Sequence, residues 1–544
     1  MPELILSNPS VRQSLSTALA GFFLCASLAA QAQTATLPPT DISNQEQPAP
    51  MPPPAVEVEP APSDAVPAPS DAVPAPATPA VVPEAPAAIA PPVPAPMPPP
   101  VVEAPPPVAI GGEPLAGFSD GTAFLRAPDN SFVLFPSGRL QVDNYVFHSA
   151  NKVPNNTFLI RRARLEVGGW IGGFVYFWLA GDFAQGPAAA AAPVAPANIA
   201  TTDDYVALAP WKNLVILQVG QYDGPFTLEN RTSDKYFDFM ERSLTVRAFG
   251  IPDNKVMGAM LHGYNDARNF YYSLALVNGD GQNFKNADNH FDWMGRGWVA
   301  PFSFTGDGPL HDVEIGASFW TGDRGNTLAL PNQTTQGTFT FLNMGSFTAT
   351  SGGTTTTYQL RQAGRLNSVA LELNAPVAHK YGARGEFVWR HSPLAEETIA
   401  TNGTGALQPG VAGADLRGTS FYGEVFAWVL GDDKIIGDQQ GIEPLSRYAK
   451  FGVKPVRDGV MVALRYEHLD ETVSDPDTKG SPAVGKTVAD SGELGVNYWH
   501  SKRFRATFNY VVNHFDRGSG ATPLLQKLAS AWEHEFLFRL AVAL

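Results

Sequence analysis

The last eleven residues of the chain follow a period-two pattern that limits how they can fold. From Phe536 to Leu544 every second residue is large and apolar, whereas the residues between, such as Glu535 and Arg539, are mostly polar or small. Successive side chains of a strand point to opposite faces, so we expect a strand with one apolar face. Such a final strand suits a closed membrane barrel, in which no edge stays unpaired in lipid. A half-buried strand of a soluble protein would show the same pattern.

The N-terminus is typical of a secretory signal peptide. Arg12 precedes an apolar stretch of small residues, and Ala30-Gln31-Ala32 supplies a cleavage site. The stretch is too short to cross a membrane, so residues 1–32 are expected to be removed on export. The single cysteine, Cys25, lies inside this segment. We therefore expect no disulfide and no thiolate metal site in the mature chain.

A proline-rich segment follows. Residues 48–108 hold 24 of the 49 prolines, mixed mainly with Ala and Val. Proline removes backbone donors and favours polyproline II, so residues 33–110 are predicted to be a disordered periplasmic linker. The linker is either a passive spacer or a contact to the cell wall or a periplasmic partner.

Charge argues against one class of partner. The formal net charge is -15, and from residue 111 onward 36 Lys and Arg face 43 Asp and Glu. Nucleic-acid binding requires a basic face, so we expect no nucleic-acid partner.

From about residue 111 to 544 the chain is aromatic, glycine-rich and polar, with alternating segments such as 313–320, 384–390, 462–467 and 503–510. Many of these place Arg or Glu between apolar residues, which favours an apolar exterior around a polar lumen. At ~25–27 residues per strand and connection, the length predicts about 16 strands. The expected fold is an all-β transmembrane antiparallel β-barrel in the outer membrane.

Connections of unequal length support this prediction. Gly172-Gly173 is expected to form a tight turn. Long stretches with few apolar anchors, of which 322–367 is rich in Thr, Gly, Asn and Gln, are expected to be external loops, at 322–367, 392–418 and 470–488. Residues 184–202 are an insertion rich in Ala and Pro that is also expected to be a loop.

The sequence contains no catalytic motif, and its ten histidines show no metal-ligand spacing. We therefore expect neither an enzyme nor a cofactor. Two other features point to transport.

The first feature is a group of arginines near the start of the predicted barrel. Alternation places Arg139, Arg162 and Arg164 on polar faces. Arg161 falls on the opposite face, so it must lie at a strand end, snorkel, or occupy a bulge. These guanidinium groups either lower the barrier for anions or pair with wall carboxylates such as Asp143 and stiffen the barrel.

The second feature is the segment from Tyr222 to Lys255, which is long, aromatic and dense in both charges. This mixture of anchors and charges suits a loop that folds back into the lumen.

Several blocks resemble one known family. SGRLQVDNY, FLIRRARLEVGG, FWLAGDFA, VGQYDGPFTLEN, MERSLT, LGVNYWHSKRFRATFNY and the terminal FRLAVAL are similar to the phosphate-selective porin O/P family of Gram-negative outer membranes. The likeness spans about residues 111–544.

The resemblance implies a 16-stranded, usually trimeric barrel whose third loop narrows the pore. It implies a constriction lined by Arg139, Arg161, Arg162 and Arg242. The family's lysine after the LE pair is Asn230 here, so Arg231 beside it is the corresponding candidate.

The expected function is therefore passive diffusion of small solutes, chiefly anions such as phosphate, by a homotrimer in outer-membrane lipid. The alternative is a structural barrel whose linker, residues 48–108, contacts the cell wall. A third reading is a soluble secreted β-protein that binds glycans.

Overall fold

The structure, a computed structural model, describes most of the chain after residue 113. The described residues are 114–119, 122–151, 153–184, 199–306, 308–330, 332–344, 347–351, 354–400, 408–436, 456–474, 485–517 and 528–543. The chain divides into two units, residues 1–99 and 100–544, and the described residues all belong to the second. The predicted signal peptide (1–32) and linker (33–110) lie outside the described residues.

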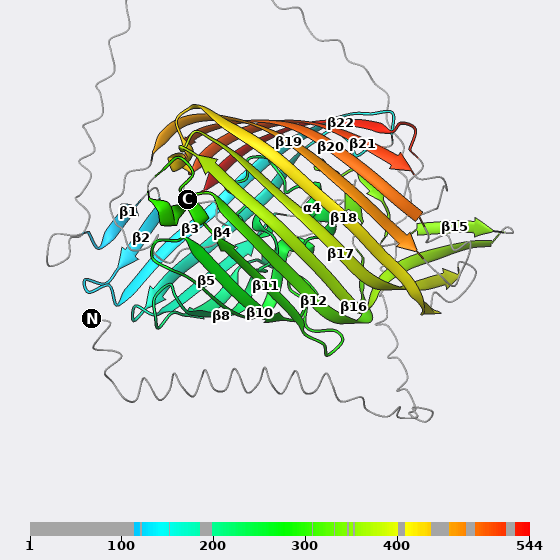
Figure 1. Cartoon of the computed structure of the whole chain (residues 1–544), viewed down its shortest axis with the longest axis horizontal. Helices are drawn as coiled ribbons and strands as arrows, with labels where there is room; N and C mark the ends of the chain where they lie inside the picture. The colour runs from blue at the N-terminus through cyan, green and yellow to red at the C-terminus, as the bar shows by residue number, and fades with distance from the viewer. Residues whose placement is uncertain are drawn as a thin grey trace, which may run out of the picture. The chain divides into compact units, whose positions relative to one another are not determined.

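Sixteen antiparallel strands of the described residues form one closed barrel (Figure 1). Each strand pairs with the next along the chain, and the last, β22, pairs with the first, β3. This confirms the predicted fold class and strand number. The strands are β3 (Phe132–His148), β4 (Thr157–Ile171), β5 (Val175–Asp182), β7 (Asp204–Leu208), β8 (Ile216–Asp223), β9 (Lys255–Tyr264), β10 (Phe270–Val277), β11 (Asp292–Val299), β12 (Glu314–Ala329), β16 (Thr354–Val377), β17 (Tyr381–Ala400), β18 (Gln408–Leu430), β19 (Arg457–Ser474), β20 (Gly485–Ser501), β21 (Phe504–Arg517) and β22 (Trp532–Ala543).

Shorter strands and helices precede the barrel or connect its strands. A hairpin precedes it, and its second strand pairs with the start of β3. Among the described residues, no helix is both long and apolar enough to span a membrane. The shorter elements are β1 (Ala116–Ser119), β2 (Thr122–Arg126), β6 (Ala200–Thr201), β13 (Gln333–Thr334), β14 (Thr340–Leu342), β15 (Phe347–Ser351), α3 (Leu228–Arg231), α4 (Leu244–Phe249), η1 (Pro252–Asn254), η2 (Pro301–Thr305) and η3 (Asp433–Ile435).

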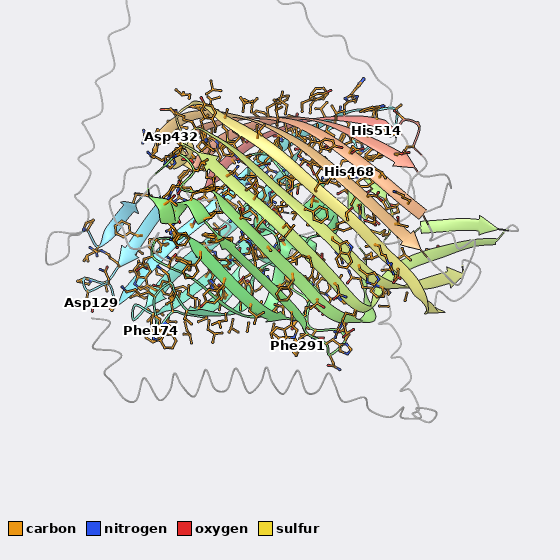
Figure 2. All side chains as sticks on the ribbon, viewed as in Figure 1. Asp129, Phe174, Phe291, Asp432, His468 and His514 are labelled. Carbon is orange, nitrogen blue, oxygen red and sulfur yellow. The ribbon has the colours of Figure 1, made fainter. Side chains whose placement is uncertain are left out.

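The two faces of each strand differ as the alternation predicts. On β22, Phe536, Phe538 and Leu540 are 40–43% exposed on the outside, whereas Glu535 and Arg539 are fully buried inside. Many side chains cover both surfaces of the wall (Figure 2). Since lipid cannot hydrogen-bond, the polar residues turn inward and contact one another.

One tight turn confirms a sequence prediction. Gly172 and Gly173 join β4 to β5 with φ values of 64° and 77°. Ile171 pairs with Val175, so the connection has three residues, and its first two adopt a positive φ that glycine allows without steric cost.

The predicted external loops are partly wrong. The stretch 322–367 is largely strand, because β12 continues to Ala329 and β16 begins at Thr354. The stretches 392–418 and 470–488 likewise contain the ends of long strands. Threonine is β-branched and fits a pleated surface, so a polar, threonine-rich stretch forms strand as readily as loop. Most of the predicted loop 184–202 lies outside the described residues.

Depth in the membrane should control the cost of a charge on the outer face. We expect Phe538→Arg, near the middle of β22, to lower the free energy of unfolding by about 2–4 kcal/mol, and Trp532→Arg, at its end, by about 0–1 kcal/mol. Urea titration of the barrel in lipid vesicles measures both. Equal losses would contradict the assignment of Phe538 to the lipid face.

Candidate functional site

A segment between β8 and β9 lies inside the barrel. This inner loop, residues 224–254, contains α3, α4 and η1; most residues of this described range are buried, and only Asp253 of the range is exposed. Its two short helices begin at side-chain caps: Thr227 Oγ1 accepts from the Asn230 N–H at 3.3 Å, and Ser243 Oγ accepts from the Val246 N–H at 3.3 Å. Such caps satisfy N–H groups that a helix leaves free at its start.

Inward side chains of neighbouring strands hold the backbone of the inner loop. Arg505 of β21 donates to the Phe237 carbonyl at 2.5 Å, and Asn497 of β20 donates to the Asp238 carbonyl at 2.7 Å. Arg539 of β22 donates to the Met240 carbonyl. Because these donors are on luminal faces, residues 237–240 lie in the lumen.

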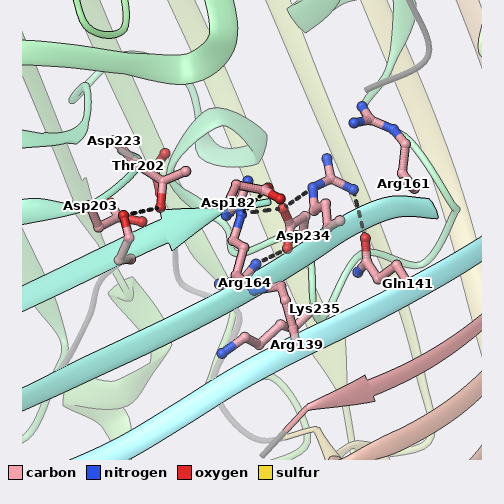
Figure 3. A network of polar contacts seen from close by, with 12 residues as sticks. Arg139, Gln141, Arg161, Arg164, Asp182, Thr202, Asp203, Asp223, Asp234 and Lys235 are labelled. Atoms are coloured by element: carbon pink, nitrogen blue, oxygen red, sulfur yellow. Dashed lines mark hydrogen bonds and ion pairs between the residues drawn. The ribbon is translucent and has the colours of Figure 1, made fainter. Parts of the chain in front are cut away.

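Three wall arginines meet one carboxylate of the inner loop. Asp234 pairs with Arg139 of β3, with Arg162 of β4 at 2.7 Å and with Arg164 at 3.8 Å. Arg139 also pairs with Glu166 at 2.6 Å. Figure 3 shows this network, with Arg139, Arg164 and Asp234 close together and Arg161 to one side.

Arg161 reaches the lumen through a β-bulge. Gln141 on β3 pairs with Arg162, but the next residue, Val142, pairs with Ile160, so Arg161 is the extra residue. Its guanidinium donates to both oxygens of Glu241 in the inner loop, at 2.9 and 3.0 Å. Of the three arrangements that the sequence left open for Arg161, the bulge is the one observed.

Burial and neighbouring charges act against each other on the ionisable groups of the inner loop. Burial alone would raise the pKa of Asp234, but Arg139 and Arg162 outweigh it and hold that pKa well below its usual range. The pKa of Glu241 is lowered in the same way by Arg161 and Arg539. Burial lowers the pKa of Lys235 to about 8, although Glu166 opposes the change. Both carboxylates are therefore charged at neutral pH.

The remaining two predicted arginines bind backbone carbonyls within or beside the inner loop. Arg242 donates to the carbonyls of Glu229 and Thr232 at 3.1 and 3.3 Å and lies over the Phe237 ring. Arg231 donates to the Asp223 carbonyl. The five predicted residues thus divide into three on the wall and two that bind backbone within or beside the inner loop.

Arg505 is a luminal residue that sequence reasoning did not single out. It is 2% exposed, lies over the Trp499 ring at 4.7 Å, and donates one hydrogen bond, to Phe237. Its Nε and Nη2 atoms have no hydrogen-bond partner among the described residues. Alternation placed Arg505 on the polar face of its strand, but no pattern distinguished it from its neighbours.

A second inner segment, residues 332–344, also packs inside the barrel. Gln333 donates to Glu471 of β19 at 2.5 Å, and the Gly337 N–H donates to Glu535 of β22 at 2.7 Å. Its Phe341 ring stacks on Phe515 of β21 at 5.0 Å. This segment falls within the stretch predicted as an external loop, and its polar residues satisfy luminal carboxylates instead of meeting water.

The charges of the inner loop enter two networks of ion pairs. One network joins Asp238 and Glu229 to two arginines and three further carboxylates of the wall, namely Arg384, Arg465, Glu424, Glu467 and Glu493. The other, the luminal network, contains Asp234 and Glu241. Among the described residues, its ion pairs join six cations and five carboxylates: Arg139, Arg161, Arg162, Arg164, Lys235, Arg539, Asp143, Glu166, Asp182, Asp234 and Glu241. Guanidinium groups in such a setting can bind oxyanions by paired hydrogen bonds. In the part of the chain that the structure describes, no group of His, Cys, Asp or Glu is arranged to hold a metal ion.

Comparison with solved structures finds distant similarity to outer-membrane porins. The anion-selective porin from Comamonas acidovorans is 12% identical with a TM-score of 0.39, and the match covers 76% of this chain and 99% of that one. The channel DcaP of Acinetobacter baumannii is 10% identical with a TM-score of 0.42, covering 79% and 100%. OmpT of Vibrio cholerae, folded in vitro, is 10% identical with a TM-score of 0.44, covering 76% and 98%.

A search of curated proteins finds no match. The family model described as phosphate-selective porin O and P matches residues 137–529, which is well over half of the chain. This match covers nearly the whole closed barrel, including the wall arginines and the inner loop. The chain therefore belongs to the phosphate-selective porin O and P family and is a Gram-negative outer-membrane channel rather than an enzyme.

Proposed function

We propose that the protein allows small solutes, with a modest preference for anions such as phosphate, to diffuse passively across the outer membrane. The inner loop narrows the pore, and Arg139, Arg161, Arg162 and Arg505 set its electrostatic field. Arg231 and Arg242 contribute indirectly, because they fix the backbone of the inner loop. No cofactor or energy source is required.

The excess of cations on the side of the inner loop that faces β3, β4 and β22 is the observation that supports this proposal. The ion pairs of the luminal network contain one more cation than carboxylates, and the adjacent Arg505 retains N–H groups without a hydrogen-bond partner among the described residues. A fixed positive charge in a narrow pore lowers the barrier for anions. The preference is modest because Asp234 and Glu241 neutralise most of these arginines, and because the other network of the inner loop joins two arginines to five carboxylates.

The remainder of the chain fits export to this location. We propose that residues 1–32 are a cleaved signal peptide, that residues 33–110 are a periplasmic linker, and that three copies assemble as a homotrimer.

One observation favours a second function. The second inner segment fills luminal space with Phe339, Phe341 and Leu342, which are 2–3% exposed. A barrel closed in this way would serve as a structural outer-membrane protein whose linker, residues 48–108, contacts the cell wall. Planar-bilayer recordings distinguish the two functions, since a folded barrel without conductance supports only the structural one.

Removing a carboxylate from the network should strengthen anion preference. In Asp234→Asn, Arg139 and Arg162 each lose one charged partner and keep Glu166 and Glu241, respectively. Two unit charges ~4 Å apart interact by about 1 kcal/mol in water, so the chloride-to-potassium permeability ratio should rise roughly fivefold. The zero-current potential under a tenfold KCl gradient measures this ratio.

Two further variants test the same prediction. Arg505→Gln should change the ratio in the opposite direction. Asp323→Asn is the matched control, because its ion pair with the exposed Arg365 lies outside the network. If Asp234→Asn and Asp323→Asn behave alike, the luminal network does not set selectivity.

Selectivity should also depend on pH. The pKa of Lys235 is about 8, so its ammonium is charged below that pH and neutral above it. Anion preference should therefore fall as the pH rises through 8. Zero-current potentials between pH 6 and 10 report the change, and Lys235→Gln should remove it. A step that persists in Lys235→Gln would assign the titration to another group.

A further inference from the structure

The lipid-facing wall contains a hollow across β18, β19, β20 and β21. Its volume is about 520 Å³, and Gly423 and Gly492 lie among its lining residues. Leu464, Tyr466 and Tyr510 also line it. Leu464 and Tyr466 are 54% and 50% exposed on the outer face of β19.

The two glycines create this space. A Cβ atom added at Gly423 or at Gly492 would meet no atom within 4 Å, and neither residue has positive φ. Neither glycine is therefore required by the backbone or by close packing. Glycine weakens a strand interior, and outward positions elsewhere on these strands hold large side chains such as Phe508. The missing side chains leave an unfilled space on the outer face of the wall.

A polar row borders the hollow on the side of the long connections. His468, Asp490 and His514 stand directly opposite one another on β19, β20 and β21, each one or two outward positions from the hollow. The Nδ1 atoms of His468 and His514 lie 2.8 and 3.9 Å from the Asp490 carboxylate. Tyr466, which lines the hollow, donates to the same carboxylate at 2.6 Å. Figure 2 labels both histidines on the same part of the barrel.

This row lies at the depth of the outer-leaflet headgroups. Trp532, the first residue of β22, pairs with His514 and its ring lies 4.5 Å from the imidazole. Aromatic residues mark the interface of membrane barrels, and the longer connections of such barrels face outward. The apolar hollow is therefore at acyl-chain depth, and the polar row is at headgroup depth above it.

We propose that this face binds one phosphate-bearing lipid of the outer leaflet, with an acyl chain in the hollow and the phosphate at the histidine row. Each imidazole turns Nδ1 toward Asp490, and its Nε2 has no hydrogen-bond partner among the described residues. An imidazolium donates from both ring nitrogens, so a protonated histidine whose Nδ1 faces Asp490 keeps a second donor, at Nε2, for a phosphate oxygen. The proposal rests on the membrane barrel and is independent of which solute passes through the pore.

Filling the hollow tests the acyl-chain half of the proposal. The full chain and its Gly423→Leu/Gly492→Leu variant are purified in mild detergent, and bound phosphatidylglycerol is counted by native mass spectrometry. We expect the variant to bind this lipid about tenfold more weakly. Ala317→Leu is the matched control, because it adds a leucine to the exposed outer face of β12 and should bind lipid as the parent does.

Removing the imidazoles tests the headgroup half. The parent should bind phosphatidylglycerol more tightly than a diacylglycerol with the same chains, and His468→Gln/His514→Gln should lose that preference while retaining the chains. Heat-modifiable migration on gels confirms that each variant is folded. If Gly423→Leu/Gly492→Leu does not fold, the lipid preference of His468→Gln/His514→Gln alone tests the proposal. Unchanged lipid binding in both variants would overturn the proposal. Loss of oligomers with unchanged lipid would also overturn it and would make this face a contact between copies.

Discussion

Closure of the barrel between β22 and β3 is the constraint on which the other features depend. Lipid offers no hydrogen-bond partners, so neither strand can be left with a free edge. A buried ion pair also joins these two strands. Arg539 of β22 donates two hydrogen bonds of 2.7 Å to Asp143 of β3, and both side chains are fully buried. Arg539 also forms an ion pair with Glu241 at 2.6 Å, so the same residue links the contact between β22 and β3 to the inner loop.

The wall and the inner loop form one electrostatic unit. Asp234 and Glu241 come from the loop, whereas most of the guanidinium groups around them come from β3, β4 and β22. Removing one partner of a buried pair leaves an uncompensated charge, which is costly. The arginines therefore both hold the loop in place and shape the field that a solute meets. Selectivity is then a small difference between charges that nearly cancel.

The sequence was sufficient to predict the barrel because each strand meets lipid on one face. Apolar and polar residues therefore alternate along β12, β17, β19 and β22. The same alternation places Arg139 and Arg162 in the lumen. The second inner segment could not be predicted, since Gln333 and Gln336 suit water and buried carboxylates equally well. The sequence allowed three arrangements for Arg161. It could not select the bulge, because a bulge depends on the register between two strands, and alternation within one strand does not give that register. Nothing local distinguished Arg505, whose position matters only through the loop beside it.

The bulge at Arg161 also bears on how the gene can change. In a regular strand, losing one codon shifts every later residue to the opposite face, which would turn arginines toward lipid. Around the bulge, Val142 pairs with Ile160 and Gln141 pairs with Arg162. A chain without residue 161 would keep both pairings and an unbroken alternation. At this one point of β4, a single-codon deletion removes a charge from the lumen and leaves the faces of the strand unchanged.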